Sequence, residues 1–133
     1  MSPCTVLLTD DEESVRKFVR IILQSQGFEV LEACDGVEAL ERLGEVGHRI
    51  SLLVTDQRMP RMDGLELAAA CNRLYPGLPV LFISGYALDI EAERGKRPGS
   101  VCGYLRKPFR PKDLVEAVLT CLEPPKQAQC TAV

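Results

Sequence analysis

Three acidic residues stand directly after two apolar runs of the chain. The run TVLLT is followed by Asp10 and Asp11, and the run SLLVT is followed by Asp56. Carboxylates that lie together repel one another unless a cation or a proton neutralises them, and Mg²⁺ prefers hard oxygen ligands of this kind. One acid of DDEES is expected only to cap the next helix. A cap does not explain Asp56, because Met59 and Pro60 follow it rather than a helix.

Two further apolar runs end on residues that can bind an anion. The run PVLFI is followed by Ser84, and the run GYLR is followed by Lys107. Taken singly, the serine could cap a helix and the lysine could be a solvated loop residue. Taken with the acids, a divalent cation, a hydroxyl donor and an ammonium group supply the charge compensation that a phosphoryl group needs. The pattern therefore indicates phosphoryl chemistry, provided that the fold gathers these residues at one rim.

Strand-like and helix-like segments alternate along the chain. The expected strands are Thr5–Thr9, Glu29–Ala33, Ser51–Thr55, Pro79–Ile83 and Val101–Leu105. Apolar residues at helical spacing lie between or after them, from Val15 to Leu23, from Val37 to Leu43, from Leu67 to Leu74 and from Leu114 to Leu122. The stretch from residue 87 to residue 100 has a short and decaying helical pattern.

Glycine and proline mark several of the expected helix boundaries. Gly27 is expected to end the first helix, and Gly44 and Gly47 to close the second. Asp35 or Gly36 begins the second helix, and Pro111 suits the first turn of the last one.

Strict alternation of strands and helices predicts an α/β fold with a parallel sheet, because parallel strands need crossover connections. We expect a flavodoxin-like, doubly wound sheet of five strands in the order 2-1-3-4-5, with helices on both faces. Ligands of such sheets bind beyond the carboxyl ends of the strands, where the strand order reverses. In this order the reversal lies between strands 1 and 3, so Asp10, Asp11 and Asp56 are predicted to share one crevice.

The composition fits a single globular domain. The chain has 133 residues, of which 46% are hydrophobic and 26% charged, and its net charge is −3. No apolar run approaches the ~20 residues of a membrane span, and no basic leader or basic stripe is present. We therefore expect a cytoplasmic protein without membrane insertion or direct contact with nucleic acid. Residues 1–123 form the expected domain, and residues 124–133 a polar tail or linker.

The six cysteines are scattered, without a CxxC pair or histidines at metal-ligand spacing, which disfavours zinc. Buried, reduced thiols are predicted in preference to a disulfide framework. The residues are Cys4, Cys34, Cys71, Cys102, Cys121 and Cys130.

Five segments, taken in order, resemble the receiver domain of two-component response regulators. They are LLTDDEESVR, EACDGVEAL, LLVTDQRMPRMDGLEL, VLFISGY and GYLRKPF, and the resemblance covers residues 5–122. It implies that Asp56 accepts a phosphoryl group. It also implies a site for Mg²⁺ (or Mn²⁺), formed by Asp10, Asp11, Asp56 and the backbone carbonyl of Arg58.

The same resemblance assigns roles to residues around the acids. Ser84 and Lys107 would hold the phosphoryl oxygens, and a cis peptide bond before Pro108 would aim the lysine into the crevice. Tyr104 would be an aromatic switch residue that moves inward from an exposed position as Ser84 is drawn toward the phosphoryl group. Arg58 and Tyr86 would modulate how long the phosphoryl group survives.

The function that the resemblance implies is phosphorelay signal transduction. A histidine kinase phosphohistidine, or a phosphotransfer domain, would supply the phosphoryl group. The chain would be no enzyme, although it would assist its own phosphotransfer and slow self-dephosphorylation. A downstream protein, or a second receiver, could bind the face formed by the fourth helix, fifth strand and fifth helix. The motifs also suggest the C-terminal receiver of a hybrid histidine kinase, with a single-domain regulator as the other reading.

Other functions fit the residues less well. An Asp-nucleophile phosphatase of the haloacid dehalogenase type places a second acid two residues after the nucleophile, where this chain has Arg58. A Ser-His-Asp hydrolase would need His48, the only histidine, which precedes the third strand at the opposite sheet edge. A calcium loop beginning at Asp56 would put Arg58 and Pro60 at ligand positions. A phosphorylation-independent pseudo-receiver that serves only as an interaction module remains the main alternative.

Overall fold

The computed structural model describes residues 4–46, 49–85 and 101–122. Its strands are β1 (Thr5–Thr9), β2 (Glu29–Ala33), β3 (Ile50–Asp56), β4 (Val80–Ser84) and β5 (Val101–Arg106). Its helices are α1 (Glu13–Ser25), α2 (Gly36–Val46), α3 (Gly64–Leu74) and α5 (Pro111–Leu122). No helix within these ranges is long and apolar enough to cross a membrane.

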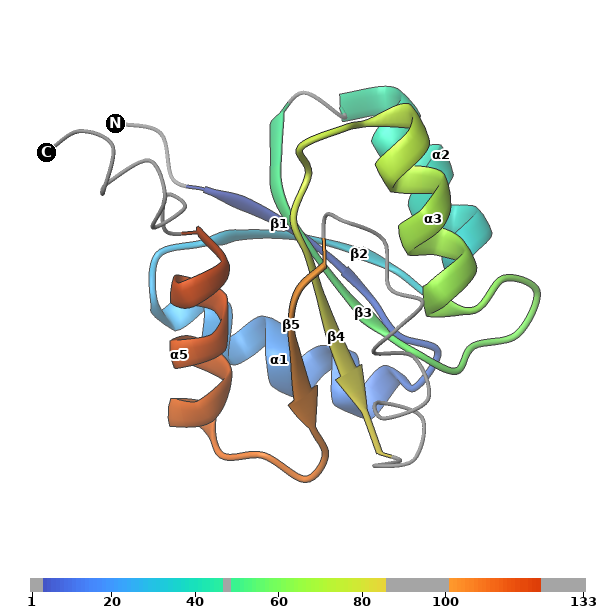
Figure 1. Cartoon of the computed structure of the whole chain (residues 1–133). Coiled ribbons are helices and arrows are strands. Elements are labelled where there is room, and N and C mark those ends of the chain that lie inside the picture. The colour runs from blue at the N-terminus through green and yellow to red at the C-terminus, as the bar shows by residue number, and fades with distance from the viewer. Residues whose placement is uncertain (1–3, 47–48, 86–100, 123–133) are drawn as a thin grey trace, which may run out of the picture.

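The five strands form one parallel sheet in the order β2-β1-β3-β4-β5, as predicted. Helices α1 and α5 cover one face of the sheet, and α2 and α3 cover the other (Figure 1). The order reverses beside β1, which pairs with β2 on one side and with β3 on the other. The carboxyl ends of β1 and β3 are therefore neighbours.

Two apolar clusters, one on each face of the sheet, form the core. Val6 and Leu8 of β1 pack in the cluster beneath α1 and α5, whereas Leu7 packs in the cluster beneath α2 and α3. Successive residues of a strand point to opposite faces, and helices cover both faces here. This arrangement explains why β1 and β3 read as continuous apolar runs rather than as alternating ones.

Most predicted boundaries agree with the structure to within a residue. Asp56 and Ser84 are the last residues of β3 and β4, rather than the residues that follow them. Gly27 has a φ of 91° just beyond α1, and Pro111 begins α5, as predicted. The prediction for Gly44 is wrong, because α2 continues through it to Val46. A glycine inside a helix costs about 1 kcal/mol, which the packing of the neighbouring turns can offset.

The prediction of buried, reduced cysteines is partly wrong. Cys102 of β5 and Cys121 of α5 form a disulfide, with 5.3 Å between their Cα atoms. Their spacing of 19 residues gives no sign of this contact, which arises because α5 folds back along β5 (Figure 1). Cys4 and Cys34 are exposed. Cys71 is the buried free thiol that was predicted, and burial raises its pKa to about 11.

Several predictions concern residues outside the described ranges. They are the boundary at Gly47, the position of His48, the role of Tyr86, the weak helix of residues 87–100, the state of Cys130 and the tail of residues 124–133.

Candidate functional site

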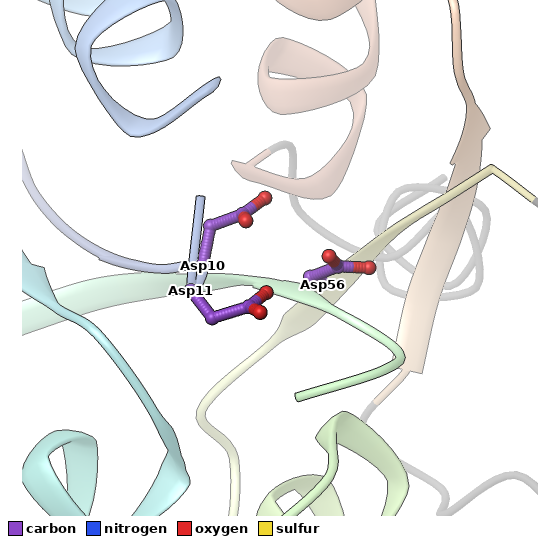
Figure 2. Close-up of side chains that lie close together, drawn as sticks. All are labelled: Asp10, Asp11 and Asp56. Carbon is purple, nitrogen blue, oxygen red and sulfur yellow. The ribbon is translucent and has the colours of Figure 1, made fainter. Parts of the chain in front are cut away.

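Three carboxylates gather where β1 and β3 end, as the strand order predicted. Ligand oxygens of Asp10, Asp11 and Asp56 all lie within 4.8 Å of one another, and Figure 2 shows the three side chains in this arrangement. Asp10 and Asp56 are buried, whereas Asp11 is exposed. Closely spaced carboxylate oxygens with one side open to solvent fit a hydrated Mg²⁺ ion, which prefers oxygen ligands and keeps several waters.

Asp10 is held firmly at the end of β1. Its Oδ1 accepts a hydrogen bond from the Glu12 amide at 2.9 Å, and the guanidinium of Arg16 donates to its carbonyl oxygen at 2.8 Å. Burial is the main cause that raises the pKa of Asp10 to about 6. The Glu12 amide opposes this rise, the charge of Asp56 adds to it, and Lys107 lowers it again. A buried carboxyl with a raised pKa indicates a site that favours an added cation.

The Glu12 amide also bears on the expected cap of α1. Glu12 occupies the N-cap position, but its side chain makes no capping hydrogen bond. The carboxylate of Asp10 instead accepts that residue's amide hydrogen. The N-cap residue thus lacks the side-chain cap that was expected from one acid of DDEES, and Asp10 of the carboxylate cluster binds its amide instead.

Lys107 brings a positive charge to the two buried acids. Its Nζ lies 3.2 Å from Oδ2 of Asp56 and 3.4 Å from Oδ2 of Asp10. Burial alone lowers the pKa of Lys107, but Asp10 and Asp56 outweigh it, so that the net shift is upward and the ammonium form is favoured. The Lys107–Pro108 bond is cis, as predicted. The Lys107 amide donates to the carbonyl of Ser84 at 2.7 Å, which fixes the chain just after β5.

Ser84 lies beside the acid at the end of β3. Asp56 is paired with Ile83 across the β3–β4 ladder, so Ser84 is the next residue along the neighbouring strand. Ser84 is 1% exposed. Arg58 is exposed, and its amide donates a 3.4 Å hydrogen bond to Oδ1 of Asp56. The structure thus brings the three carboxylates, the Lys107 ammonium and the Arg58 amide together, with Ser84 on the neighbouring strand.

Tyr104 differs from its expected starting position. Its side chain is half-buried rather than exposed, and its ring stacks on Phe82, with 5.5 Å between centroids and 18° between planes. It packs against the apolar cluster beneath α2 and α3. Tyr104 therefore does not start from the exposed position that the resemblance implies. Its role as a switch residue stays a prediction.

Gly64 is a positioning residue that the sequence analysis missed. A Cβ at Gly64 would collide with the carbonyl oxygen of Asp56 and lie 3.0 Å from Cα of Gln57. The Gly64 amide also donates to the Gln57 carbonyl at 2.9 Å. The start of α3 can approach the end of β3 this closely only without a side chain. Position 64 therefore helps to set where Asp56 sits.

A capping box fixes the start of α3, and its signal was available in the sequence. Asp63 accepts a hydrogen bond from the Glu66 amide at 2.8 Å, and the Glu66 carboxylate accepts one from the Asp63 amide at 3.2 Å. An acid three residues before a glutamate, ahead of an apolar helical pattern, is the usual mark of this motif.

A bridge between two loops at the same edge was also missed. Arg61, whose φ is 66°, donates from Nε to Oδ2 of Asp35 at 2.8 Å, and its Nη2 lies 2.7 Å from the same oxygen. The Glu38 amide is the main cause that lowers the pKa of Asp35, and Arg61 lowers it further. Because no spacing rule links residues 35 and 61, sequence alone offered no signal.

Comparison with known proteins identifies the family. The family model of the response regulator receiver domain matches residues 6–119, and the chain belongs to this family. It is a receiver domain of the two-component system type. Receiver domains act with histidine kinases or phosphotransfer partners, and they generally bind Mg²⁺ at an acidic pocket.

Three relatives illustrate the range of proteins that carry such a domain. The chain is 42% identical over 119 residues to the sensor kinase CckA of Brucella abortus, covering 90% of this chain but 12% of CckA. It is 36% identical over 118 residues to the response regulator receiver protein CpdR of the same organism, covering 85% of this chain and 92% of CpdR. The solved structure of the Thermotoga maritima response regulator TrrA, in complex with Mg(2+)-BeF, superposes with a TM-score of 0.78 and 26% identity, covering 90% and 99%.

Proposed function

We propose that the chain accepts a phosphoryl group on Asp56 in a Mg²⁺-dependent reaction and thereby switches a protein-interaction surface. The observation that carries this proposal is the position of the Lys107 ammonium, 3.2 Å from the Asp56 carboxylate, at the rim of the three-acid cluster. Asp56 alone combines contact with Lys107, membership of the acid cluster and a place beside Ser84.

The phosphoryl group would come from a phosphohistidine of a histidine kinase or phosphotransfer domain, or from a small phosphodonor. A carboxylate oxygen of Asp56 attacks phosphorus, a P–O bond forms and the P–N bond breaks. The imidazole leaves with the bonding electron pair and takes up a proton from solvent. Asp56 is buried, and the Lys107 ammonium beside its Oδ2 compensates its negative charge. The carboxylate therefore stays ionised and can act as the nucleophile.

The residues around Asp56 divide the remaining work. Asp10, Asp11, Asp56 and the Arg58 carbonyl would hold Mg²⁺, which would neutralise the acids and the incoming phosphoryl oxygens. Lys107 can exchange its present partner Asp56 for a phosphoryl oxygen, and Ser84 can donate a hydrogen bond to another. The fit of this arrangement to Mg²⁺ is supported by TrrA, a relative solved in complex with Mg(2+)-BeF.

The output follows from the neighbours of Ser84 and Lys107. Tyr104 lies on β5, the strand that leads to Lys107, and its ring packs on Phe82 of β4. A shift of Ser84 toward the phosphoryl group would change how Tyr104 and Phe82 pack, because packed side chains change between discrete arrangements. The chain is thus a regulatory phosphoacceptor of the cytoplasm and no enzyme in its own right.

The test is phosphorylation with acetyl phosphate, followed by intact mass spectrometry with and without Mg²⁺. We expect one added phosphoryl group in the presence of Mg²⁺, and none in Asp56→Asn. Asp63→Asn is the matched control, because Asp63 lies in the same loop region and asparagine preserves its cap. Equal labelling of Asp56→Asn and the wild type would contradict the assignment, as would labelling that persists when Mg²⁺ is chelated.

A further inference from the structure

The two cysteines that the proposed function leaves unused join the far end of β5 to the last turn of α5. Cys102 is the second residue of β5, and Cys121 is the last residue but one of α5. Lys107 follows β5 at its opposite end. One strand therefore carries the phosphoryl-binding lysine just beyond one end and a disulfide at the other.

An irregularity in β5 aims Cys102 at α5. In the β4–β5 ladder Val80 pairs with Val101, but Leu81 pairs with Gly103, so Cys102 is the extra residue of a β-bulge. Val101 packs against the cluster beneath α2 and α3, whereas Cys102 packs against the cluster beneath α1 and α5. Because a bulge breaks the alternation of the strand, Gly103 can face the same side of the sheet as Cys102.

Gly103 leaves room for the partner sulfur on that side. A Cβ placed on Gly103 would lie 3.9 Å from Sγ of Cys121 and 3.5 Å from Cδ1 of Leu81. These are ordinary contacts, so a small residue fits there, but a larger side chain would enter the space that the Cys121 sulfur occupies. The bulge and the glycine together place the two sulfurs within bonding reach.

The surroundings also suit the reduced pair. The carbonyl oxygen of Val80 lies 3.3 Å from Sγ of Cys102, so a thiol at position 102 has an acceptor available. A sulfur in a disulfide has no hydrogen to donate, and the same contact then becomes a simple van der Waals neighbour. Both cysteines line an open groove of about 400 Å³ between β5 and α5, which gives a small thiol access to the bond.

The closed loop contains the parts that respond to the phosphoryl group. The disulfide spans 19 residues, and between its ends lie Tyr104, Lys107 and nearly all of α5. When the bond is intact, α5 is tethered to the β5 strand at a second point. When it is broken, the last turn of α5 loses this covalent link to β5.

We propose that Cys102 and Cys121 form a reversible thiol–disulfide switch, and that the disulfide restricts the movement of α5 relative to β5 when Asp56 is phosphorylated. The second half of this statement rests on the proposed function. Disulfides of reducing compartments are mostly transient and redox-sensing, which agrees with a regulatory bond in a cytoplasmic receiver.

The chemistry is thiol–disulfide exchange with a small disulfide such as oxidised glutathione. One cysteine thiolate attacks a sulfur of the oxidant, forming a mixed disulfide and releasing one glutathione thiolate. The second cysteine thiolate attacks the protein sulfur of that mixed disulfide and releases the second glutathione thiolate. The protein dithiol loses two protons and two electrons, and the oxidant is reduced to two thiols.

The first experiment tests the bond itself. The background protein carries serine in place of Cys4, Cys34 and Cys130, so that the buried Cys71 is the only other thiol. After equilibration with oxidised and reduced glutathione, free thiols are alkylated and the peptides are mapped by mass spectrometry. We expect a peptide pair linked through Cys102 and Cys121 that reduced dithiothreitol releases. Alkylation of both residues under oxidising conditions, or linkage of either one to Cys71 or to glutathione alone, would overturn the proposal.

A stability measurement on the same protein guards against a misfolded variant. Closing a loop of this length is expected to lower the unfolding equilibrium constant on the order of 100-fold. The oxidised and reduced forms of one background protein are compared, so that no further substitution is needed. Equal unfolding midpoints for the two forms would contradict the tether.

The second experiment tests the coupling. Hydrogen exchange of residues 101–122 is measured with and without beryllofluoride and Mg²⁺, in which beryllofluoride stands in for the phosphoryl group. We expect a change in the exchange of α5 in the dithiol form and its loss in the disulfide form. An identical change in both forms would overturn the coupling while leaving the phosphoryl site intact. If beryllofluoride changed the hydrogen exchange of α5 in neither form, both the coupling and the proposed function would be contradicted. The existence of the Cys102–Cys121 disulfide is tested separately, by the peptide mapping.

Discussion

The two ends of β5 are held in opposite ways. Beyond its carboxyl end, Lys107 contacts the carboxylates of Asp10, which follows β1, and Asp56, which ends β3; they are 97 and 51 residues away in the sequence. At its amino end, Cys102 is bonded covalently to α5, the next element along the chain, which begins nine residues later.

The difference shows how one strand can serve both chemistry and stability. The carboxyl end concentrates buried acids, one of which has a raised pKa, so the site there is kept at a cost in free energy. The amino end constrains the chain with a bond that restricts the unfolded state. When Lys107 moves at the carboxyl end of β5, the disulfide therefore holds the amino end of the strand against α5.

The largest expected effect is loss of the lysine from the carboxyl end. Lys107→Ala should slow phosphorylation by acetyl phosphate on the order of 100-fold or more, because one preorganised charge at the reacting group is removed. Lys107→Arg, which preserves the charge, should retain more activity than the alanine variant. The rate is followed by intact mass spectrometry over time. A Lys107→Ala rate equal to the wild type would remove the lysine from the reaction.

The next effect concerns the amino end. Reduction of the Cys102–Cys121 bond should lower the free energy of unfolding by about 3 kcal/mol, as expected for a loop of this length. Urea denaturation of the oxidised and reduced protein measures the difference. A variant with Cys4 and Cys34 replaced by serine should show the same difference, since both residues are exposed and outside the bond. An unfolding midpoint that reduction leaves unchanged would show that the disulfide does not stabilise the amino end of β5.

A smaller effect should show that the carboxyl end is kept at a cost. Without metal at pH 7, Asp10→Asn should stabilise the fold by on the order of 2 kcal/mol, because the pKa of Asp10 is raised from 3.8 to about 6. A folded-state pKa above the unfolded value means that the ionised form opposes folding. The gain should shrink as pH falls through about 6 and vanish below 3.8, where the carboxyl is protonated in both states.

The measurement is chemical denaturation at several pH values. Asp11→Asn is the control, because Asp11 is exposed and its replacement should change stability by less than about 0.5 kcal/mol. Added Mg²⁺ should stabilise the wild type more than Asp10→Asn. Destabilisation by Asp10→Asn at pH 7 would contradict the account of this end.

The smallest expected effect is on the lifetime of the phosphoryl group. Arg58→Ala should speed its hydrolysis severalfold, because the exposed Arg58 side chain lies two residues beyond Asp56 and can shield the attacking water's path. The decay of the phosphorylated form is followed after removal of the donor. Arg73→Ala, an exposed arginine of α3, is the control and should leave the decay unchanged. Equal decay of all three proteins would show that shielding is absent.

The sequence predicts the carboxyl end well, and the reason is physical. Five apolar runs in strict alternation with helical patterns leave little choice of topology, and a parallel sheet then aligns the carboxyl ends of its strands. Residues that end different strands, such as Asp10, Asp56 and Lys107, must therefore meet. The cis bond before Pro108 followed from the resemblance and agrees with the structure.

The amino end could not be predicted in this way. The disulfide depends on a β-bulge at Cys102 and on the return path of α5, and neither leaves a periodic signal. The close approach at Gly64 depends on how α3 enters beside β3, which a single glycine in a turn does not reveal. The half-buried ring of Tyr104 likewise depends on its stacking with Phe82, a choice of packing rather than of pattern.

The central claim is that Asp56 is the phosphoacceptor, and the most direct test locates the phosphoryl group. Borohydride reduces an aspartyl phosphate to homoserine, so the phosphorylated protein can be reduced, digested and sequenced by mass spectrometry. We expect homoserine at position 56 alone, and no homoserine when Mg²⁺ is chelated before the phosphodonor is added. Homoserine at Asp10 or Asp11 instead, or none in a protein that has taken up phosphate, would contradict it.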